Sequence, residues 1–458
     1  MNRPAPISTR RSAVAGRFFP ADPARLHDTV ADCLAGAKAG PSAPRAIISP
    51  HAGYPFSGRL AGAAWGATRA ADVARVVVLS PSHRHAFDGI ALPSQDRFAM
   101  PGFAIDIDAA ARRMLVERGL AHVEDAAHDH EHGVETQLPF LNALHSGARV
   151  LPLVIGRADD ARVACIIDAL AMMDETPPLF VLSSDLSHFL TRDAARDHDA
   201  ETARLIETGH PGQITGAHAC GAAAIRGFMT SDAGRGLRVR RLGMANSADV
   251  TGDPTRTVGY GAWSFHGPAD AILADEDRAA LLRAARRALT DRIATGKTPA
   301  VAVKAFAQPL RGHGAAFVTL LENGRLRGCI GSLVPRRPLV TDVVENTLRA
   351  ALNDPRFAPM QPEELDRVTF KIAVLSPATP IRVEGETDLL ARLRPGRDGL
   401  LLSDGNHRGV FLPMVWDSLP EPRDFLAALK QKAGLPGDHW SDNLRMERFR
   451  AESFAEPA

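Results

Sequence analysis

The stretch Ile47–Tyr54, which reads IISPHAGY, decides the expected fold, because a short apolar run ends there in Ser-Pro and a histidine follows. The arrangement recurs at Val76–His83 and at Leu179–His188. Continuous apolar runs of this length are typical of strands that are buried on both faces of a parallel sheet. Ligands of open α/β sheets bind outside the carboxyl ends of the strands. The sequence therefore predicts that three strand ends bring titratable side chains to one edge, namely His51, His83, Asp185 and His188.

Length and composition describe a globular chain of more than one domain. The chain has 458 residues, of which 45% are hydrophobic and 23% are charged. Length alone suggests about two to four domains at roughly 100–200 residues each. The formal net charge is +1, so no strong electrostatic field favours nucleic acid or a membrane as a partner. No apolar stretch reaches the roughly 18 residues of a membrane span, and the N-terminus lacks a signal-peptide core.

Without an expected membrane span or signal peptide, the chain is predicted to be cytoplasmic, and its cysteines are consistent with this location. They are far apart and form no CxxC pair, at Cys33, Cys165, Cys220 and Cys329. A disulfide framework is not expected in a chain of this size. The spacing also excludes a closely spaced three-cysteine iron–sulfur motif. Cys33 and Cys165 fall in expected apolar helices and are predicted to be inert.

Histidines and acidic residues are concentrated in the stretch His128–Glu135, where eight positions hold three of each. For His128 and His130 a solvated polar loop is the favoured interpretation. For Glu131, His132 and Glu135 a functional role is favoured, because they open an expected helix over 134–144. The i, i+4 spacing would align Glu131 with Glu135 on that helix. Glu135 is accordingly predicted as a catalytic carboxylate, together with Asp185 and His188.

The order of apolar runs and helical patterns changes after residues 266–270, where a Gly-Pro pair indicates a linker. Apolar runs and helical patterns alternate before this point, as they do in βαβ units. After it, an amphipathic helix is expected over 275–295 and a hairpin around Asn323-Gly324. Strands in runs with few helices suggest an α+β fold. We therefore expect an α/β domain over residues 8–266 and an α+β domain over residues 272–455.

The first part of the chain, residues 11–265, resembles the Memo family, which is protein B of the AmmeMemoRadiSam system in prokaryotes. The matching stretches are Ala13–Pro20, Pro50–Tyr54, Pro81–His83, Glu131–Phe140 and Ser183–Asp185. The resemblance implies a fold like the catalytic subunit of class III extradiol dioxygenases, which are non-haem iron proteins. It also implies a metal held by two motif histidines and by a cysteine before a glycine, here His51, His83 and Cys220. Asp185 and His188 match residues that line the same site.

Residues 275–450 resemble the AMMECR domain, which is protein A of the same system. The central match is Leu326–Leu333, which reads LRGCIGSL. This resemblance implies a fold more than an activity. In this motif, Arg327 beside Cys329 leaves two interpretations open, a reactive thiol or a tight structural turn. The name of the system also implies a radical-SAM protein as a possible partner.

Two imidazoles and a thiolate suit Fe(II), Zn(II) or Cu better than Mg or Ca. Fe(II) is the expected metal, with Cu and Zn as alternatives, although a dioxygenase-type site would hold a carboxylate where Cys220 stands. Three functions compete. The first is a redox enzyme acting on an unknown small-molecule or protein substrate, the second a binding or scaffold protein with a structural metal, and the third a zinc hydrolase. A closed shell of four protein ligands would favour the second. For Asp185 the alternative to a role in the site is that it caps the helix that follows it.

Overall fold

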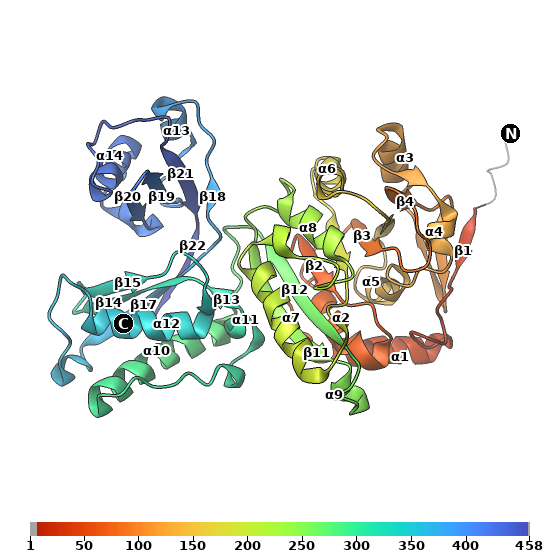
Figure 1. Ribbon diagram of the computed structural model, residues 1–458, viewed down its shortest axis with the longest axis horizontal. Coiled ribbons are helices and arrows are strands. Elements are labelled where there is room, and N and C mark those ends of the chain that lie inside the picture. Colours follow the sequence, from red (N-terminus) through yellow and green to blue (C-terminus); the bar gives the residue numbers. More distant parts are fainter. Residues whose placement is uncertain (1–6, 457–458) are drawn as a thin grey trace. The chain divides into compact units, whose positions relative to one another are not determined.

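The structure is a computed structural model that describes residues 7–456 (Figure 1). The chain divides into two compact units. The first runs to Arg235 and includes Val239–His266, and the second comprises Gly236–Arg238 and the chain from Gly267 onward. The division coincides with the expected linker, except that Gly236–Arg238 belongs to the second unit. The detailed domain bounds 8–266 and 272–455 stay a prediction.

Four parallel strands form the centre of the first unit, and they include the three apolar runs seen in the sequence. They lie side by side in the order β2 (Ala46–Ser49), β9 (Leu179–Ser183), β3 (Arg75–Pro81) and β8 (Arg149–Ile155). Antiparallel pairing extends the sheet at both sides of this core. The flanking strands are β10 (His188–Leu190), β11 (Arg238–Asn246), β12 (Thr257–His266), β4 (Ile90–Leu92) and β7 (His122–Val123). The predicted parallel sheet is confirmed.

The carboxyl ends of the central strands are level with one another. Ser49 of β2 pairs with Ser183 of β9, and Leu182 of β9 pairs with Leu79 of β3. In each case the chain then turns away from the sheet, so the residues two positions beyond the strand meet at one edge. This edge is where an open α/β sheet binds its ligands.

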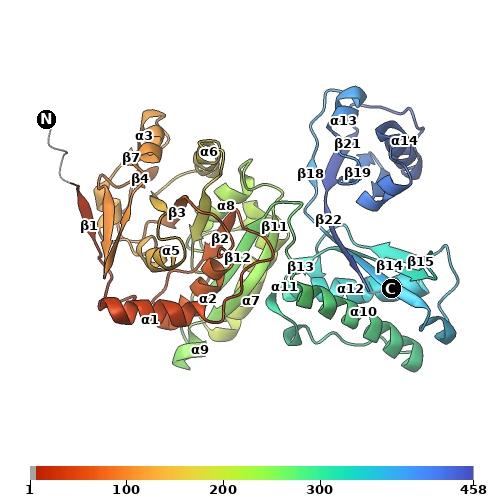
Figure 2. The same cartoon turned by 180° about the vertical axis from the view of Figure 1, so that it is seen from behind.

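Helices cover both faces of this sheet (Figures 1 and 2). Val76 and Val78 of β3 share a buried cluster with Trp65 of α2. On the opposite face Phe180 of β9 contacts Phe228 of α8, with ring centroids 5.6 Å apart. Burying a side chain of this kind stabilises the fold by roughly 1.5–3 kcal/mol. The helices are α1 (Pro23–Leu34), α2 (Tyr54–Gly66), α3 (Ala109–Glu117), α4 (Asp125–Asp129), α5 (Leu138–Leu144), α6 (Asp160–Ala171), α7 (Arg192–Glu207), α8 (Ala222–Thr230) and α9 (Ala248–Thr251).

The beginning of the described chain is held by a small separate sheet. β1 (Thr9–Arg11) pairs in parallel with β5 (Arg97–Met100). β5 in turn forms an antiparallel pair with β6 (Phe103–Asp106). The pairing joins segments almost ninety residues apart in sequence, and local patterns give no sign of it.

The second unit is α+β, as predicted. Its larger sheet is antiparallel with the order β15-β14-β17-β22, and its smaller sheet has the order β18-β21-β19-β20. Figure 2 shows α10 and α12 on one side of the larger sheet. The strands are β13 (His313–Gly314), β14 (Ala316–Glu322), β15 (Arg325–Gly331), β16 (Arg337–Pro338), β17 (Val368–Leu375), β18 (Thr379–Pro380), β19 (Gly399–Asp404), β20 (His407–Phe411), β21 (Arg445–Phe449) and β22 (Ala451–Ala455). The helices are α10 (Asp275–Thr295), α11 (Gln308–Arg311), α12 (Leu339–Leu352), α13 (Glu386–Arg392) and α14 (Pro422–Lys432).

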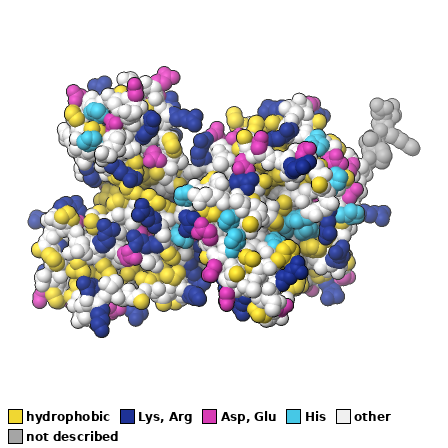
Figure 3. All heavy atoms as spheres, in the orientation of Figure 1, with side chains coloured by type: hydrophobic (Ala, Val, Ile, Leu, Met, Phe, Trp, Pro, Cys, Tyr) yellow, Lys and Arg dark blue, Asp and Glu magenta, His cyan; other side chains and the backbone are white. Residues whose placement is uncertain are grey.

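The surface agrees with the balanced composition. On the face shown in Figure 3, lysine and arginine side chains are scattered among acidic ones and do not gather into one patch. Among residues 7–456, no helix combines the length and the apolar character needed to cross a bilayer.

Candidate metal centre

Three potential metal ligands converge at the carboxyl edge of the parallel sheet. His51 follows β2, His83 follows β3, and Cys220 lies in the loop before α8. The three ligand atoms all lie within 4.8 Å of one another, and His51 Nε2 is 3.2 Å from Cys220 Sγ. Ligand bonds to zinc are about 2.0–2.3 Å long, so small side-chain adjustments would bring these atoms around one ion. The structure thus brings together the set that the Memo resemblance implies.

The imidazole of His51 is held in the tautomer that suits a ligand. The Ser183 hydroxyl donates its only proton to the Gly133 carbonyl at 2.6 Å. The Ser183 oxygen must therefore accept from His51 Nδ1, which is 2.9 Å away. Nδ1 is then protonated, and the lone pair of Nε2 faces Cys220. Hydrogen bonds of this kind orient metal-binding histidines in proteins generally.

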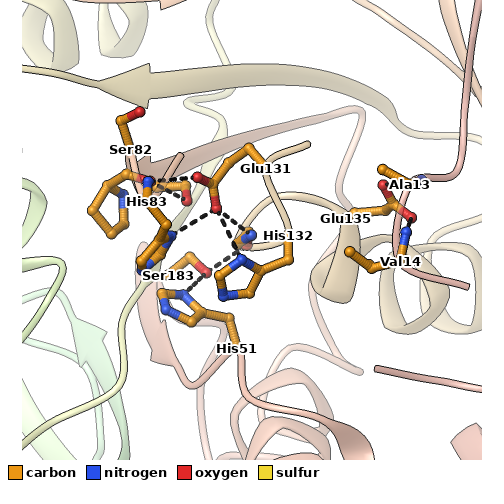
Figure 4. Close-up of polar contacts among 12 residues, drawn as sticks. Ala13, Val14, His51, Ser82, His83, Glu131, His132, Glu135 and Ser183 are labelled. Atoms are coloured by element: carbon orange, nitrogen blue, oxygen red, sulfur yellow. Dashed lines mark hydrogen bonds and ion pairs between the residues drawn. The ribbon is translucent and has the colours of Figure 1, made fainter. Parts of the chain in front are cut away.

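His83 is held in the same way, by a carboxylate (Figure 4). One oxygen of Glu131 is 2.8 Å from His83 Nδ1, and the other accepts the backbone N–H of His83 at 2.8 Å. The backbone N–H of Gly133 also donates to Glu131, at 2.8 Å. Burial raises the pKa of Glu131, but the His83 hydrogen bond and charge outweigh it and lower the pKa to about 2. The ionised carboxylate leaves His83 Nε2 available for metal.

His132 is a third imidazole beside the centre. Its ring lies 4.4 Å from that of His83 and 5.1 Å from that of His51, measured between centroids. Burial, followed by the charges of His51 and His83, lowers the pKa of His132 to about 3. The ring is therefore neutral at pH 7 and can bind a metal ion or a ligand. One potential ligand atom each of His83, Glu131 and His132 also lies within 4.8 Å of the others.

The surroundings of Cys220 favour its neutral thiol over the thiolate. Its sulfur accepts the backbone N–H of Asp185 at 3.2 Å. Burial, with the charge of Asp185, raises the pKa of Cys220 to about 12, whereas burial and the charge of His83 lower the pKa of His51 to about 3. Both groups are thus neutral at pH 7. A metal ion deprotonates a coordinating thiol, so the donor set fits a divalent ion.

Asp185 and His188 lie beside this centre, and neither of them is part of a helix. β9 ends at Ser183 and β10 begins at His188, and the residues between them form a loop. Asp185 is not the cap of a following helix, because its carboxylate accepts the backbone N–H of His51 at 2.9 Å. Burial raises the pKa of Asp185 above its ordinary value. His188 bonds the Leu186 carbonyl through Nδ1 at 2.9 Å.

Glu135 is not brought to the centre. Its carboxylate points away from the histidines and toward the beginning of the described chain (Figure 4). It accepts from Arg10 Nη1 at 2.8 Å and from the backbone N–H groups of Ala13 and Val14 at 2.9 and 3.1 Å. The expected alignment with Glu131 fails because helical structure begins only at Glu135. The two carboxylates therefore diverge, and Glu135 has the contacts of a structural residue.

The other two histidines of the stretch also serve the fold or face solvent. His128 is buried and not in a solvated loop, and its Nε2 lies 3.1 Å from the Ala91 carbonyl oxygen. His130 is exposed. The density of histidines in the sequence therefore indicated the region of the site, although among the histidine and acidic side chains of this stretch only those of Glu131 and His132 reach it.

A cavity of about 420 Å³ adjoins the centre, with Cys220 in its wall. Most of the lining is apolar and includes Pro81, Phe87 and Ile155, together with small residues at the start of α8. Its polar lining side chains are Ser82 and Arg157. Pockets of this size and apolar character bind small organic molecules. The centre is thus bordered by space for a ligand.

The fold and the site together define an α/β protein with a histidine- and cysteine-rich metal-binding edge. The family model described as Memo-like protein matches residues 10–264, and the AMMECR1 model matches residues 282–454. The chain belongs to the Memo-like protein family and is fused to an AMMECR1 domain.

Each of the three similar proteins described here matches less than half of this chain. A protein of Methanothermobacter thermautotrophicus is 42% identical over 31% of this chain and 74% of its own length. Protein MJ0810 of Methanocaldococcus jannaschii is 34% identical over 37% of this chain and 86% of its own length. The crystal structure of the uncharacterized protein PH0010 from Pyrococcus horikoshii matches with 34% identity and a TM-score of 0.38, over 40% of this chain and 93% of that one.

The Glu131→Gln variant should bind metal about 10–100-fold more weakly, as is usual when the partner of a metal-binding histidine is lost. Both carboxylate oxygens of Glu131 accept N–H groups, so the amide NH₂ of glutamine would face a donor. Isothermal titration with Zn²⁺ or anaerobic Fe²⁺ measures the affinity. Glu117→Gln, on the exposed side of α3, is the matched control. An unchanged affinity would mean that Glu131 does not orient a ligand.

Proposed function

We propose that this protein is a metal-dependent redox enzyme of the non-haem iron type, which acts on a small organic substrate within the AmmeMemoRadiSam system. The observation that carries the proposal is the convergence of His51, His83 and Cys220 beside a cavity. Catalytic metal sites have three protein ligands and an open position, whereas structural sites are closed by four. The cavity beside Cys220 supports the open type and disfavours a purely structural metal.

The donor set favours iron over magnesium or calcium, because imidazole and thiolate are nitrogen and sulfur ligands. His51, His83 and Cys220 would hold the ion, and bound iron would supply one-electron chemistry at this edge. The neutral ring of His132 can accept a proton or a hydrogen bond from a ligand. Asp185 and His188 are the groups that we propose to hold or move a proton during turnover.

A zinc hydrolase is the second candidate, because two imidazoles and a thiolate also suit zinc. Metal analysis of the full chain, expressed in iron-supplemented medium and purified without oxygen, separates the two. About one iron per chain supports the redox proposal. About one zinc per chain, with iron absent, supports the hydrolase instead, and a metal-free protein that does not take up either ion contradicts both.

The Asp185→Asn variant should keep its metal. The asparagine oxygen can still accept the backbone N–H of His51, so the position of that ligand is preserved. If Asp185 acts as a general acid or base, turnover of an identified substrate should fall by about 10²–10⁴-fold. Metal content and turnover are measured on the same preparation. Loss of the metal would instead make Asp185 a ligand and would weaken the assignment of Cys220.

A radical-SAM protein is the partner that we propose, on the basis of the family resemblance alone. Co-purification of the two full-length proteins tests this, and the absence of any complex under anaerobic conditions would contradict it.

A further inference from the structure

The cavity beside the metal centre has a wall built from the ends of strands that also position the candidate ligands. Pro81 of β3 pairs directly with Ile155 of β8, and both residues line the cavity of about 420 Å³. Ser82, which precedes the candidate ligand His83, and the candidate ligand Cys220 belong to the wall as well. A molecule bound at the metal can therefore extend into this space.

The loop after β3 is fixed against the end of β8 by backbone contacts. The Phe87 carbonyl accepts the N–H of Arg157 at 2.9 Å, and the Gly89 carbonyl accepts the N–H of Gly156 at 3.0 Å. A Cβ on Gly156 would lie only 2.3 Å from the Phe87 carbonyl oxygen, so this close approach requires glycine. The Phe87 ring also packs edge-on against the ring of His122, with centroids 5.9 Å apart. The cavity is thus preformed by the fold, as ligand pockets usually are.

The polar side chains of the wall already have partners within the protein. The Ser82 hydroxyl donates to the His85 carbonyl at 2.6 Å. Arg157 is paired with Asp88 at 2.8 Å, and its side chain is 83% exposed, so its charge stays in solvent. A polar substituent that entered the cavity would lose its hydrogen bonds with water without an equivalent replacement from these side chains. The cavity therefore favours an uncharged hydrocarbon group.

Polar backbone groups of the wall are concentrated at the start of α8. This helix begins at Ala222, two residues after Cys220. The first N–H groups of a helix have no partner within it, and in the described chain no side chain caps α8. A ligand would therefore place its polar atoms at the metal and at this first turn, and its hydrocarbon group along the rest of the wall.

Two alanines in the first turn of α8 leave the space that such a group would occupy. Ala223 and Ala224 both line the cavity. Ala224 is fully buried, whereas Ala223 is half-buried. A larger side chain at Ala223 would therefore fill part of the cavity with the smaller disturbance of the core.

We propose that the substrate joins an oxygen-bearing group, which binds the metal, to an uncharged hydrocarbon group, which fills this cavity, and that Ala223 and Ala224 limit the size of that group. This inference rests on the proposed function, because it requires that the metal centre holds the substrate. It adds the class of the substrate, which is an amphipathic organic molecule rather than a sugar or a nucleotide.

Hydroxamates test the proposal on the full chain loaded with Zn²⁺, because their two oxygens bind the metal and their tails probe the cavity. Isothermal titration measures the affinities of acetohydroxamate, hexanohydroxamate and 5-hydroxypentanohydroxamate. Hexanohydroxamate has four more methylenes than acetohydroxamate and should bind on the order of 100-fold more tightly, at about four-fold per buried methylene. The hydroxyl-terminated chain has the same length and should lose most of this gain, because its hydroxyl would be buried without a partner.

Two variants place the hydrocarbon tail in the cavity. Ala223→Leu should reduce the advantage of hexanohydroxamate to less than about ten-fold, and should leave the zinc content and the affinity for acetohydroxamate unchanged. Ala86→Leu, in the exposed loop after β3 that also lines the cavity, should act in the same direction and serves if Ala223→Leu does not fold. Ala110→Leu on the exposed side of α3 is the matched control. Circular dichroism verifies that each variant is folded.

The proposed function and the substrate class fail in different ways. A protein that takes up no metal ion, or whose metal binds none of the hydroxamates, contradicts the open metal centre itself. Equal affinities for acetohydroxamate and hexanohydroxamate, or a hydroxyl-terminated chain that binds as tightly as hexanohydroxamate, leave the metal centre intact and overturn the substrate class. A hexanohydroxamate advantage that persists in both cavity variants would show that the tail binds elsewhere, and would overturn the assignment of this cavity.

Discussion

Cys220→Ala is expected to abolish stoichiometric metal binding while the first unit stays folded. The variant removes one of three converging ligands, so the affinity should fall on the order of 10²–10³-fold, if the binding free energy divides roughly evenly among the ligands. The fold should tolerate the change, because alanine is smaller and the loop is held by backbone contacts, such as the Cys220 N–H that donates to the Asp185 carbonyl at 3.2 Å. Metal content after anaerobic purification, with circular dichroism on the same sample, measures both effects.

The matched control is Cys165→Ala, which removes an exposed thiol of α6 and should leave the metal content unchanged. His51→Ala should match Cys220→Ala, because the two ligand atoms are 3.2 Å apart. A Cys220→Ala protein that retains a full equivalent of metal would show that the ion binds elsewhere. The group of His83, Glu131 and His132 would then be the alternative.

Glu135→Gln should lower the free energy of unfolding by about 3–5 kcal/mol, which is typical of breaking a buried ion pair. The Arg10 and Glu135 side chains are 5% and 0% exposed. Each oxygen of Glu135 accepts hydrogen bonds, from Arg10 and Ala13 on one side and from Ser12 and Val14 on the other. The NH₂ group of glutamine would therefore face a donor, and the guanidinium of Arg10 would lose its counter-charge.

Urea unfolding followed by circular dichroism measures this difference, with Glu117→Gln on the exposed face of α3 as the matched control. The control should change stability by less than about 0.5 kcal/mol. A Glu135→Gln protein as stable as the control would contradict the structural role and would reopen the catalytic role that the sequence suggested.

The strands that position the site could be predicted because their signals are local. The apolar runs that became β2, β3 and β9 are continuous, and each is followed by a histidine or aspartate. Parallel pairing then brings their ends together without further information. The prediction of Cys220 as a ligand, in contrast, rested only on the family resemblance. Nothing in its local sequence distinguishes it from a small buried hydrophobic residue.

The residues that orient the ligands could not be predicted, because their contacts are distant in sequence. Glu131 bonds His83 across 48 positions, and Ser183 bonds His51 across 132. The expected alignment of Glu135 with Glu131 fails for a different reason. Residues at i and i+4 share a face only within one helix, and here helical structure begins at Glu135 itself. The position at which a helix starts is hard to predict from sequence. Here that position decides which of the two carboxylates lies near the metal ligands.

X-ray absorption spectroscopy of the anaerobically purified full chain, measured at the absorption edge of its metal, shows which atoms bind the ion. We expect one sulfur neighbour at about 2.3 Å and imidazole nitrogens at about 2.0–2.1 Å. We also expect the sulfur contribution to disappear when the remaining metal of Cys220→Ala is measured. A first shell of nitrogen and oxygen alone in the unmodified protein would contradict the assignment of His51, His83 and Cys220 as the ligands.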